Sequence, residues 1–242
     1  APPNLVEGKI DIGTMSEPMS GKDIGDFRNV YGYEPVAIKV AIDMIAVLVN
    51  RNNPLSCITI DELDGIYSST NLCDGSAVVS TWGELNLGGE WKNAPIRVYG
   101  RTSVSGTYDV FRKIALCNGS YKNGITEMAS SRDIIDFVSK DVYSIGYSGI
   151  GYTTPGVKTV QVGKSEESCY PPEREFAMSN KYPFTRYLYL YPRENPSENM
   201  NPLIKEFLKY ILSKNGQEAV LEAGFTLLPA NIIVEERKRI DQ

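Results

Sequence analysis

Residues 36–49 are Val-Ala-Ile-Lys-Val-Ala-Ile-Asp-Met-Ile-Ala-Val-Leu-Val, an apolar stretch rich in β-branched side chains. Such a run is typical of a strand buried on both faces in a mostly parallel sheet. It is too short to span a membrane, and Lys39 and Asp43 interrupt it. We therefore assign it to the sheet of a protein core.

Short extended and helical patterns alternate on both sides of this strand. Strands are predicted at residues 9–13, 96–99, 143–148 and 185–191. Helices are predicted at residues 20–31, 59–66, 80–85, 107–116, 131–139, 202–213 and 216–223. Ser20 is expected to cap the first helix and Gly32 to end it, and Thr59 with Glu62 forms a capping box. Strands that alternate with helices predict an α/β protein with a largely parallel sheet.

Length and charge limit the classes of protein to consider. The chain has 242 residues, which is enough for one large domain or two modest ones. A net charge of −5 argues against a nucleic-acid-binding protein, because such proteins usually present a basic face to phosphates. It does not argue against a small anion, which local dipoles can hold. The first residues lack the features of a signal peptide, so such a peptide is absent or already removed.

The sequence contains no histidine. Catalytic triads and metal centres that depend on imidazole are therefore impossible. Ser-Lys and paired-carboxylate chemistry remain open, but the sequence shows no motif for either. We predict that the protein is not an enzyme, has no catalytic residues and uses neither a metal nor a cofactor.

The four cysteines are Cys57, Cys73, Cys117 and Cys169, and none of them forms a CxxC pair. Zinc and thioredoxin-type sites are therefore disfavoured. An even count is compatible with two disulfides in an oxidising compartment and equally with four free thiols. Of the three possible connectivities, Cys73–Cys117 with Cys57–Cys169 is a guess, since nothing in the spacing selects it.

The segment at residues 99–107, Tyr-Gly-Arg-Thr-Ser-Val-Ser-Gly-Thr, lies between a predicted strand and a predicted helix. A helix that starts here leaves its first N–H groups unpaired and presents the positive end of its dipole. The pattern GxxxxGK[ST] is missing, so nucleotide hydrolysis is unsupported. The segment has the character of an anion-binding loop.

Five residues of this segment are the candidate ligands of an oxyanion. Gly106 lets the backbone approach a ligand closely. Ser103, Ser105 and Thr107 supply hydroxyl donors, and Arg101 offers a planar fork suited to a tetrahedral oxyanion. In the alternative interpretation, the serines and threonine only cap the helix, and the arginine is a surface residue.

A second loop of the same kind follows the first predicted strand. Residues 13–19 are Gly-Thr-Met-Ser-Glu-Pro-Met, and their hydroxyls belong to Thr14 and Ser16. Two strand-to-helix loops on separate halves of the chain could close on one ligand, because α/β proteins build sites at the carboxyl ends of parallel strands.

Taken together, these segments resemble the phosphate-binding proteins of bacterial ABC-type phosphate uptake systems, which belong to the periplasmic-binding-protein superfamily. The resemblance covers nearly the whole chain in the expected order. The matching stretches are Leu-Val-Glu-Gly-Lys-Ile-Asp-Ile-Gly-Thr-Met-Ser-Glu-Pro-Met at 5–19, Tyr-Gly-Tyr at 31–33, Val-Ala-Ile-Asp-Met-Ile-Ala-Val-Leu-Val-Asn at 40–50, Asn-Pro-Leu at 53–55, residues 101–107, Ile-Gly-Tyr-Ser-Gly-Ile-Gly-Tyr at 145–152, Lys-Tyr-Pro-Phe-Thr-Arg at 181–186 and Ser-Lys-Asn-Gly-Gln-Glu at 213–218.

The resemblance implies a type II periplasmic-binding-protein fold, an α/β architecture with two lobes, mostly parallel sheets and a hinge with two crossovers. The crossovers are expected near residues 42–47 and 145–151. Lobe one would comprise residues 1–45 and 147–242, and lobe two residues 46–146. The resemblance also implies capture of inorganic phosphate between the lobes, delivery to a membrane ABC permease, and a periplasmic or extracytoplasmic, membrane-associated location. A monomer is expected, because a hinged protein needs both lobes free to move.

The resemblance also assigns roles to individual residues. Arg101, Ser105, Gly106 and Thr107 are expected to contact phosphate from lobe two, and Ser16 from lobe one. From their place at the second expected crossover, Tyr147 and Ser148 are expected near the ligand, one layer behind the residues that contact it.

Selectivity against sulfate is a separate question. Some members of the family carry an aspartate at the position of Ser16, where it accepts the proton of hydrogen phosphate and rejects sulfate. Here we expect Asp43 to serve as the acceptor instead. The alternative for this residue is a hinge or helix-capping role.

Similar proteins begin with a strand, a helix and a loop rich in Gly, Ser and Thr, and this chain starts just after that region. Lobe one is therefore expected to lack part of its sheet and of its site.

Three alternative functions remain open: a binder of another oxyanion such as sulfate, a phosphate-sensing or surface paralogue with an incomplete pocket, and an enzyme acting on phosphate esters.

Overall fold

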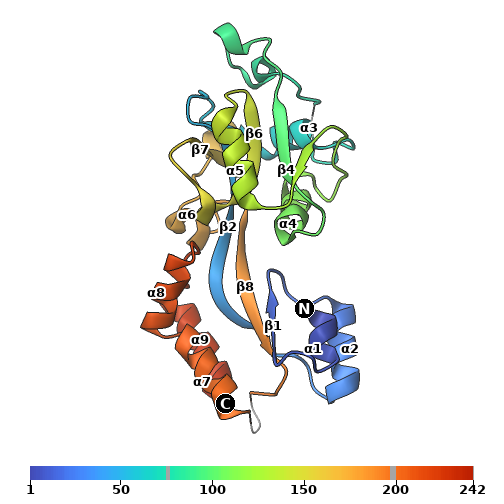
Figure 1. Cartoon of the computed structure of the whole chain (residues 1–242), viewed down its shortest axis with the longest axis vertical. Helices are drawn as coiled ribbons and strands as arrows, with labels where there is room; N and C mark the ends of the chain where they lie inside the picture. Colours follow the sequence, from blue (N-terminus) through green and yellow to red (C-terminus); the bar gives the residue numbers. More distant parts are fainter. Residues whose placement is uncertain (75–76, 197–199, 242) are drawn as a thin grey trace. The chain divides into compact units, whose positions relative to one another are not determined.

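The apolar run at residues 36–49 forms strand β2 (Ile38–Asn50) in the computed structural model, which describes residues 1–74, 77–196 and 200–241 (Figure 1). Every residue from Val40 to Asn50 is buried. The chain divides into two units, unit 1 with Ala1–Asp43 and Arg186–Gln242, and unit 2 with Met44–Thr185. β2 therefore passes from the first unit into the second.

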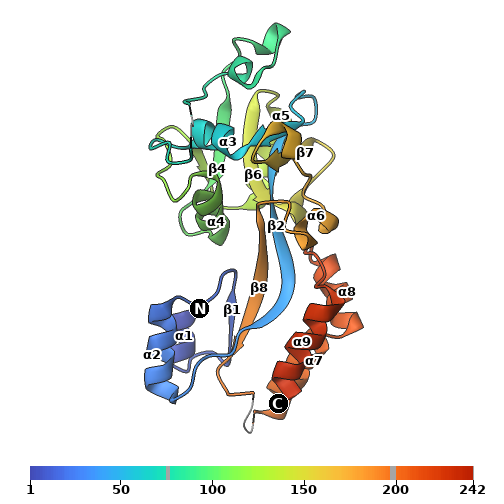
Figure 2. The same cartoon turned by 180° about the vertical axis from the view of Figure 1, so that it is seen from behind.

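Unit 1 is built on the strand order β1–β8–β2. β1 (Ile12–Met15) pairs antiparallel with β8 (Thr185–Pro192). In both views α1 and α2 lie together beside β1, and α7, α8 and α9 lie together beside β2 (Figures 1 and 2). The helix bounds are α1 (Pro2–Val6), α2 (Gly21–Tyr31), α7 (Pro202–Ile211), α8 (Lys214–Glu222) and α9 (Ala230–Asp241).

The local signals that predicted α2 are confirmed. The Ser20 side chain accepts the N–H of Asp23 in a capping box, and Gly32 ends the helix in the left-handed conformation that glycine adopts most easily. Phe27 of α2 packs with Leu5 of α1 and with Tyr191 of β8 in a buried cluster. This cluster fixes the two helices against one part of the unit 1 sheet.

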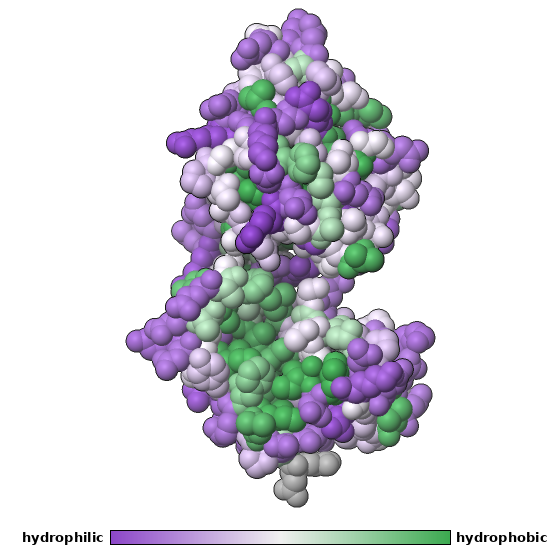
Figure 3. All heavy atoms as spheres, viewed as in Figure 1, coloured by the Kyte–Doolittle hydropathy of each residue, from purple (hydrophilic) through white to green (hydrophobic). Residues whose placement is uncertain are grey.

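Another part of the same sheet carries an apolar groove of about 570 Å³. Its walls come from β1, β2, β8, α7, α8 and the segment after α8, and the green area in the lower half of Figure 3 shows the apolar side chains that gather on this face of unit 1. The lining residues are Ile12, Thr14, Val40, Ala41, Leu188, Leu190, Phe207, Tyr210, Ile211, Gly216, Ala219, Val220, Ala223 and Phe225.

Unit 2 combines parallel and antiparallel pairings. β4 (Arg97–Arg101) runs parallel to both β5 (Thr126–Met128) and β6 (Ser144–Gly149), and β3 (Cys57–Thr59) runs parallel to β7 (Val157–Gly163). The segments around this sheet are α3 (Ile60–Tyr67), η1 (Trp82–Leu85), η2 (Gly89–Trp91), α4 (Gly106–Ala115), α5 (Ser131–Lys140), η3 (Ile150–Tyr152), η4 (Glu166–Ser168) and α6 (Arg174–Met178).

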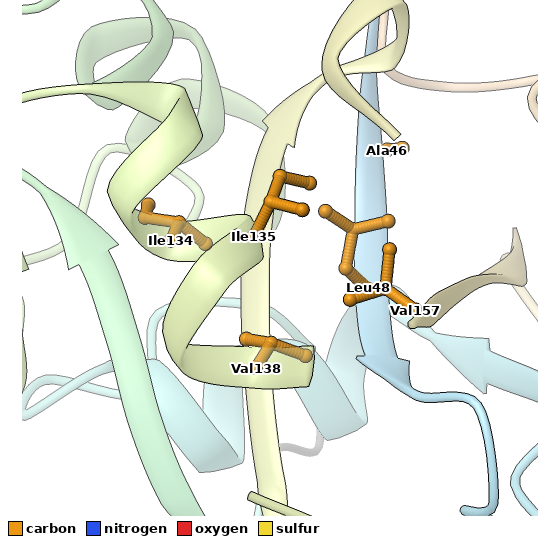
Figure 4. Close-up of a cluster of buried hydrophobic side chains, with 6 residues drawn as sticks. All are labelled: Ala46, Leu48, Ile134, Ile135, Val138 and Val157. Carbon is orange, nitrogen blue, oxygen red and sulfur yellow. The ribbon is translucent and has the colours of Figure 1, made fainter. Parts of the chain in front are cut away.

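The expected parallel pairing holds for these strands, but β2 pairs antiparallel with both β6 and β7. A strand that is buried on both faces has the same apolar pattern in either direction, so the sequence could not specify its pairing. Figure 4 shows how α5 covers this region, with Ile135 and Val138 pointing toward Leu48 of β2 and Val157 of β7.

The division into units differs from the expected lobes at the second boundary. The first boundary, after Asp43, lies close to the expected residue 45, but the second lies after Thr185 rather than after residue 146. Residues beyond 146 stay in unit 2 because Val47–Asn50 of β2 pairs with Val157–Val160 of β7. Local sequence carries no signal for this pairing, since more than a hundred residues separate the partners.

Two disulfides lie within unit 2 and confirm the guessed connectivity. Cys57 is bonded to Cys169, with Cα atoms 5.9 Å apart, and Cys73 to Cys117, with Cα atoms 5.4 Å apart. The four cysteines are therefore paired rather than free. Within the described ranges, none of the helices has the length and apolar character that crossing a bilayer requires.

Candidate anion-binding site

The anion loop (residues 101–107) joins the end of β4 to the start of α4 in unit 2, as the sequence predicted. β4 lies between two parallel neighbours, β5 and β6. The loop therefore leaves the carboxyl end of a parallel strand, where α/β proteins place ligands. Its backbone turns sharply, with the Ser105 N–H donating to the Thr102 carbonyl at 3.0 Å.

Ser105 is the N-cap residue of α4, and its Oγ accepts the N–H of Thr107 at 3.2 Å. Both residues are buried, at 9% exposure each. Gly106 is the first helical residue. Capping and anion binding are therefore compatible interpretations of the loop, because a hydroxyl that accepts an N–H can also donate its own proton, and this serine stands at the positive end of the helix dipole.

The guanidinium of Arg101 is held in place by the start of α5. Its Nη1 donates to Ser131 Oγ at 2.9 Å, and its Nη2 donates to the Ala129 carbonyl at 3.0 Å. Its Nε is buried and has no hydrogen-bond partner among the described residues. These bonds use two of the five N–H donors of an arginine, and a buried donor left unpaired is costly unless a ligand supplies an acceptor.

Ser103 lies at the exposed tip of the anion loop, beside Val104, whose exposure is 93%. The structure therefore brings Arg101, Ser105 and Thr107 together in a partly buried setting and leaves Ser103 in a more open one.

Two tyrosines are hydrogen-bonded to the ends of the anion loop, and sequence reasoning largely missed them. The Oη of Tyr147 on β6 accepts the N–H of Arg101 at 3.2 Å, and it lies 2.9 Å from the Oη of Tyr121. Tyr121 also donates to the carbonyl of Tyr108 in the first turn of α4, at 3.1 Å. Tyr147 was expected near the ligand, but Tyr121 carries no sequence signal, because it lies in a segment without a recognisable motif.

Burial controls the ionisation of these phenols. It raises the pKa of Tyr147 to about 12, and it raises the pKa of Tyr121 well above its usual range. Both side chains therefore stay protonated and neutral at physiological pH, and each keeps one proton to donate.

The candidates from the second loop lie in unit 1. Thr14 is inside β1 rather than in a loop, because the strand runs to Met15 instead of ending at Gly13. Thr14 lines the apolar groove, and Ser16 follows the end of β1 and is partly exposed. Their contact with a ligand stays a prediction.

Asp43 is buried in β2 and bonded to Arg186 of β8. Such an ion pair is what we would expect if Asp43 had the alternative, structural role at the hinge. The role of Asp43 as a proton acceptor stays a prediction. Among the described residues, no group of three or more cysteine, aspartate or glutamate side chains is arranged to hold a metal ion.

Residues 3–215 match the family described as a PBP superfamily domain. The chain is 40% identical over 241 residues to the phosphate-binding protein PstS of Pseudomonas aeruginosa. The alignment covers 99% of this chain and 75% of that protein.

Two solved structures with 25% sequence identity share the fold. One is a possible phosphate binding protein from Planctomyces limnophilus, with a TM-score of 0.71 and coverage of 99% of this chain and 83% of that chain. The other is named "Putative Phosphate ABC Transporter Substrate-Binding Protein with Bound Phosphate", from Clostridium perfringens, with a TM-score of 0.72 and coverage of 94% of this chain and 83% of that chain.

Proposed function

Because this chain belongs to the PBP (periplasmic-binding-protein) superfamily, and within it to the family of the phosphate-binding protein PstS, we propose that it binds inorganic phosphate for an ABC-type uptake system. The observation that carries this proposal is the anion loop. There, the buried Nε–H of an arginine has no hydrogen-bond partner among the described residues, and the arginine lies in the segment that leads into a ten-residue helix.

The chemistry of the loop suits a tetrahedral oxyanion. A phosphate needs several donors directed at its oxygens, and charge-assisted bonds from a guanidinium are the strongest that a protein offers. Arg101 keeps three N–H donors beyond the two that orient it among the described residues. The hydroxyls of Ser105 and Thr107 and the dipole of α4 add to this set.

We assign the ligand contacts in unit 2 to Arg101, Ser105, Gly106 and Thr107, with Ser103 as an outer donor. In unit 1, we assign them to Ser16 and Thr14. Asp43 is the candidate proton acceptor. These assignments rest on the position of each residue in its own unit.

We make three further proposals, which concern catalysis, location and oligomeric state. We assign the protein to binding and delivery without catalysis, since the chain has no histidine for the common triads. We place it outside the cytoplasm, because disulfides such as Cys57–Cys169 and Cys73–Cys117 persist in oxidising compartments. We also propose that the protein is a monomer. The apolar groove and the edge strand β1 are surfaces through which copies could associate. Light scattering over a range of protein concentrations therefore tests the proposal.

Sulfate is the second candidate ligand, because residue 16 is a serine and offers no carboxylate to accept a proton. Sulfate is fully ionised at neutral pH, whereas phosphate retains at least one proton. The donors of the anion loop suit both ions, so a carboxylate acceptor is what would separate them.

Isothermal titration of the whole chain with phosphate, alone and in excess sulfate, tests the proposal. We expect phosphate to bind also in the presence of excess sulfate. Arg101→Ala should weaken the affinity for phosphate by about 100-fold or more, since a charge-assisted hydrogen bond is lost. Arg132→Ala is the matched control, because it removes the same charge from an exposed position on α5. Absence of phosphate binding, or equal losses in both variants, would contradict the proposal.

A further inference from the structure

A chain of hydrogen bonds joins the two ends of the anion loop through a pair of phenols. It runs from the N–H of Arg101 to Tyr147 at 3.2 Å, from Tyr147 to Tyr121 at 2.9 Å, and from Tyr121 to the Tyr108 carbonyl at 3.1 Å. Arg101 is the first residue of the loop, and Tyr108 directly follows its last residue. The phenols therefore bridge the point where β4 ends and the point where α4 begins.

The number of protons fixes the direction of this chain. A carbonyl only accepts, so Tyr121 must give its single proton to Tyr108. The Tyr121 oxygen can then only accept from Tyr147, whose own oxygen accepts the N–H of Arg101. Every donor points the same way, and hydrogen bonds aligned in this manner polarise and strengthen one another.

Packing leaves the phenol of Tyr147 little freedom. Its side chain is fully buried, and its ring stacks on Phe111 of α4 with centroids 3.8 Å apart and planes inclined by 6°. The ring of Tyr67 meets it edge-on at 5.7 Å. Because Phe111 belongs to the helix that begins in the anion loop, this stacking also fixes α4 relative to β6.

Gly100 provides the room in which this phenol reaches the strand. A Cβ at this position would lie 3.4 Å from the Tyr147 Oη and 3.1 Å from a methyl group of Ile125. A larger residue would therefore press on the hydroxyl that receives the Arg101 N–H. The sequence Tyr-Gly-Arg at 99–101 thus suits the hydrogen-bond chain as well as the anion loop.

Tyr121 is held firmly on its own side. The N–H of Lys122 donates to the Tyr67 carbonyl at 2.8 Å, and Tyr121 forms a bridge with Ser68. The Cys73–Cys117 disulfide lies just before this segment. The Tyr121 end of the hydrogen-bond chain is therefore anchored to covalently restrained structure rather than to a loose loop.

We infer that Tyr147 and Tyr121 are positioning residues for anion binding, which hold the ends of the anion loop in a binding-competent geometry through Arg101 and Tyr108. The inference rests on the proposed function, since phosphate is the anion that reports on the loop. The hydroxyls act by pre-organisation, so that less ordering is needed when the anion binds.

Hydroxyl removal tests the inference. Tyr147→Phe leaves the Arg101 N–H without its acceptor, and we expect the Kd for phosphate to rise about tenfold. Tyr121→Phe should have a smaller effect, because the Tyr147 oxygen still accepts from Arg101. The double variant should bind no more weakly than Tyr147→Phe alone, since both substitutions interrupt one chain.

Tyr182→Phe is the matched control. Tyr182 is a fully buried phenol of unit 2 that donates to the carbonyl of Ile45 in β2 at 2.8 Å, and β2 does not carry the anion loop. Its hydroxyl loss should lower the melting temperature about as much as Tyr147→Phe does and leave the Kd unchanged. A wild-type Kd in Tyr147→Phe, or the same loss of affinity in Tyr182→Phe, overturns the inference.

A second readout on the ligand-free protein separates this inference from the proposed function. The amide of Arg101 should exchange with solvent about tenfold faster in Tyr147→Phe, and its proton resonance should move upfield, with neither change in Tyr182→Phe. If the unmodified protein binds no phosphate, the proposed function fails, and the amide of Arg101 still decides whether the phenols hold the loop. Unchanged exchange refutes that role.

Discussion

Asp43 and Arg186 form a buried ion pair at the place where both strands leave unit 1. Nε and Nη2 of Arg186 lie 2.9 and 2.8 Å from Oδ2 of Asp43, and the two side chains are 13% and 8% exposed, respectively. Asp43 is the last residue of the first unit 1 segment, and Arg186 is the first residue of the second. The pair therefore ties β2 to β8 and explains an acid within an apolar run.

Asp43→Asn should destabilise the fold and also reduce the preference for phosphate over sulfate. The substitution leaves the Arg186 charge buried without its carboxylate, so we expect the free energy of unfolding to fall by about 3–5 kcal/mol. Because Asp43 is also the proposed proton acceptor, the ratio of phosphate to sulfate affinity should fall. Urea unfolding and competition titration measure the two quantities.

Asp11→Asn is the control for this prediction. Asp11 pairs with Arg193 in the same unit, but its side chain is 63% exposed. Loss of an exposed pair should cost less than about 1 kcal/mol. An unchanged ratio of phosphate to sulfate affinity in Asp43→Asn would leave Asp43 with a structural role alone.

Ser105→Ala should affect both stability and binding. The serine caps α4 and accepts the Thr107 N–H, so its loss should cost about 1 kcal/mol of stability. Loss of a hydroxyl donor at the proposed site should also raise the Kd for phosphate about tenfold. Thermal unfolding and calorimetric titration check the two effects.

Thr59→Ala separates capping from ligand binding. Thr59 caps α3 in the same unit by accepting the Glu62 N–H at 3.2 Å. We expect this variant to lose a similar amount of stability and to bind phosphate normally. Should both variants weaken binding equally, the serine acts only through the stability of the unit.

What the sequence could predict was local. The caps of α2 and α3 and the strand–loop–helix pattern around Arg101 depend on residues a few positions apart, and the structure has each of them in place. Glycine and hydroxyl residues have strong preferences at such positions whatever the tertiary fold.

What it could not predict depends on distant partners. Arg186 is 143 residues from Asp43, and Tyr147 is 46 residues from Arg101, so no local pattern reports either bond. Thr14 shows a further limit, because a shift of the β1 boundary placed it within the strand, beside the apolar groove. Side chains alternate along a strand, so a small error in strand position reverses the face of a residue.

Removal of the Cys73–Cys117 disulfide should destabilise the protein strongly. The bond closes a loop with a sequence separation of 44, for which the chain-entropy relation gives about 4 kcal/mol. Both cysteines are replaced together by serine, so that no free thiol is left to mispair. Urea unfolding of the double variant measures the loss, and a midpoint equal to that of the unmodified protein would contradict the prediction.

Stability should decline in alkali, and Tyr147 should account for part of the decline. Burial raises the pKa of Tyr147 to about 12, whereas an unfolded tyrosine ionises near pH 10. Between these values the folded protein keeps a proton that the unfolded chain has lost, so unfolding releases a proton. The stability contributed by this phenol is therefore complete below about pH 10 and is lost as the pH rises toward about 12.

Tyr147→Phe should thus be less stable at neutral pH and yet less sensitive to alkali. Removing one titrating phenol should make the decline shallower by about 1.4 kcal/mol per pH unit within that window. Tyr182→Phe should show the same shallower slope, because burial also raises the pKa of Tyr182 well above its usual range. Urea unfolding at several pH values measures the slopes. The stability of Tyr147→Phe could instead decline with pH as steeply as that of the unmodified protein. The pKa of Tyr147 would then be the same in the folded and unfolded chains, and the buried hydrogen-bond chain would not require the neutral phenol.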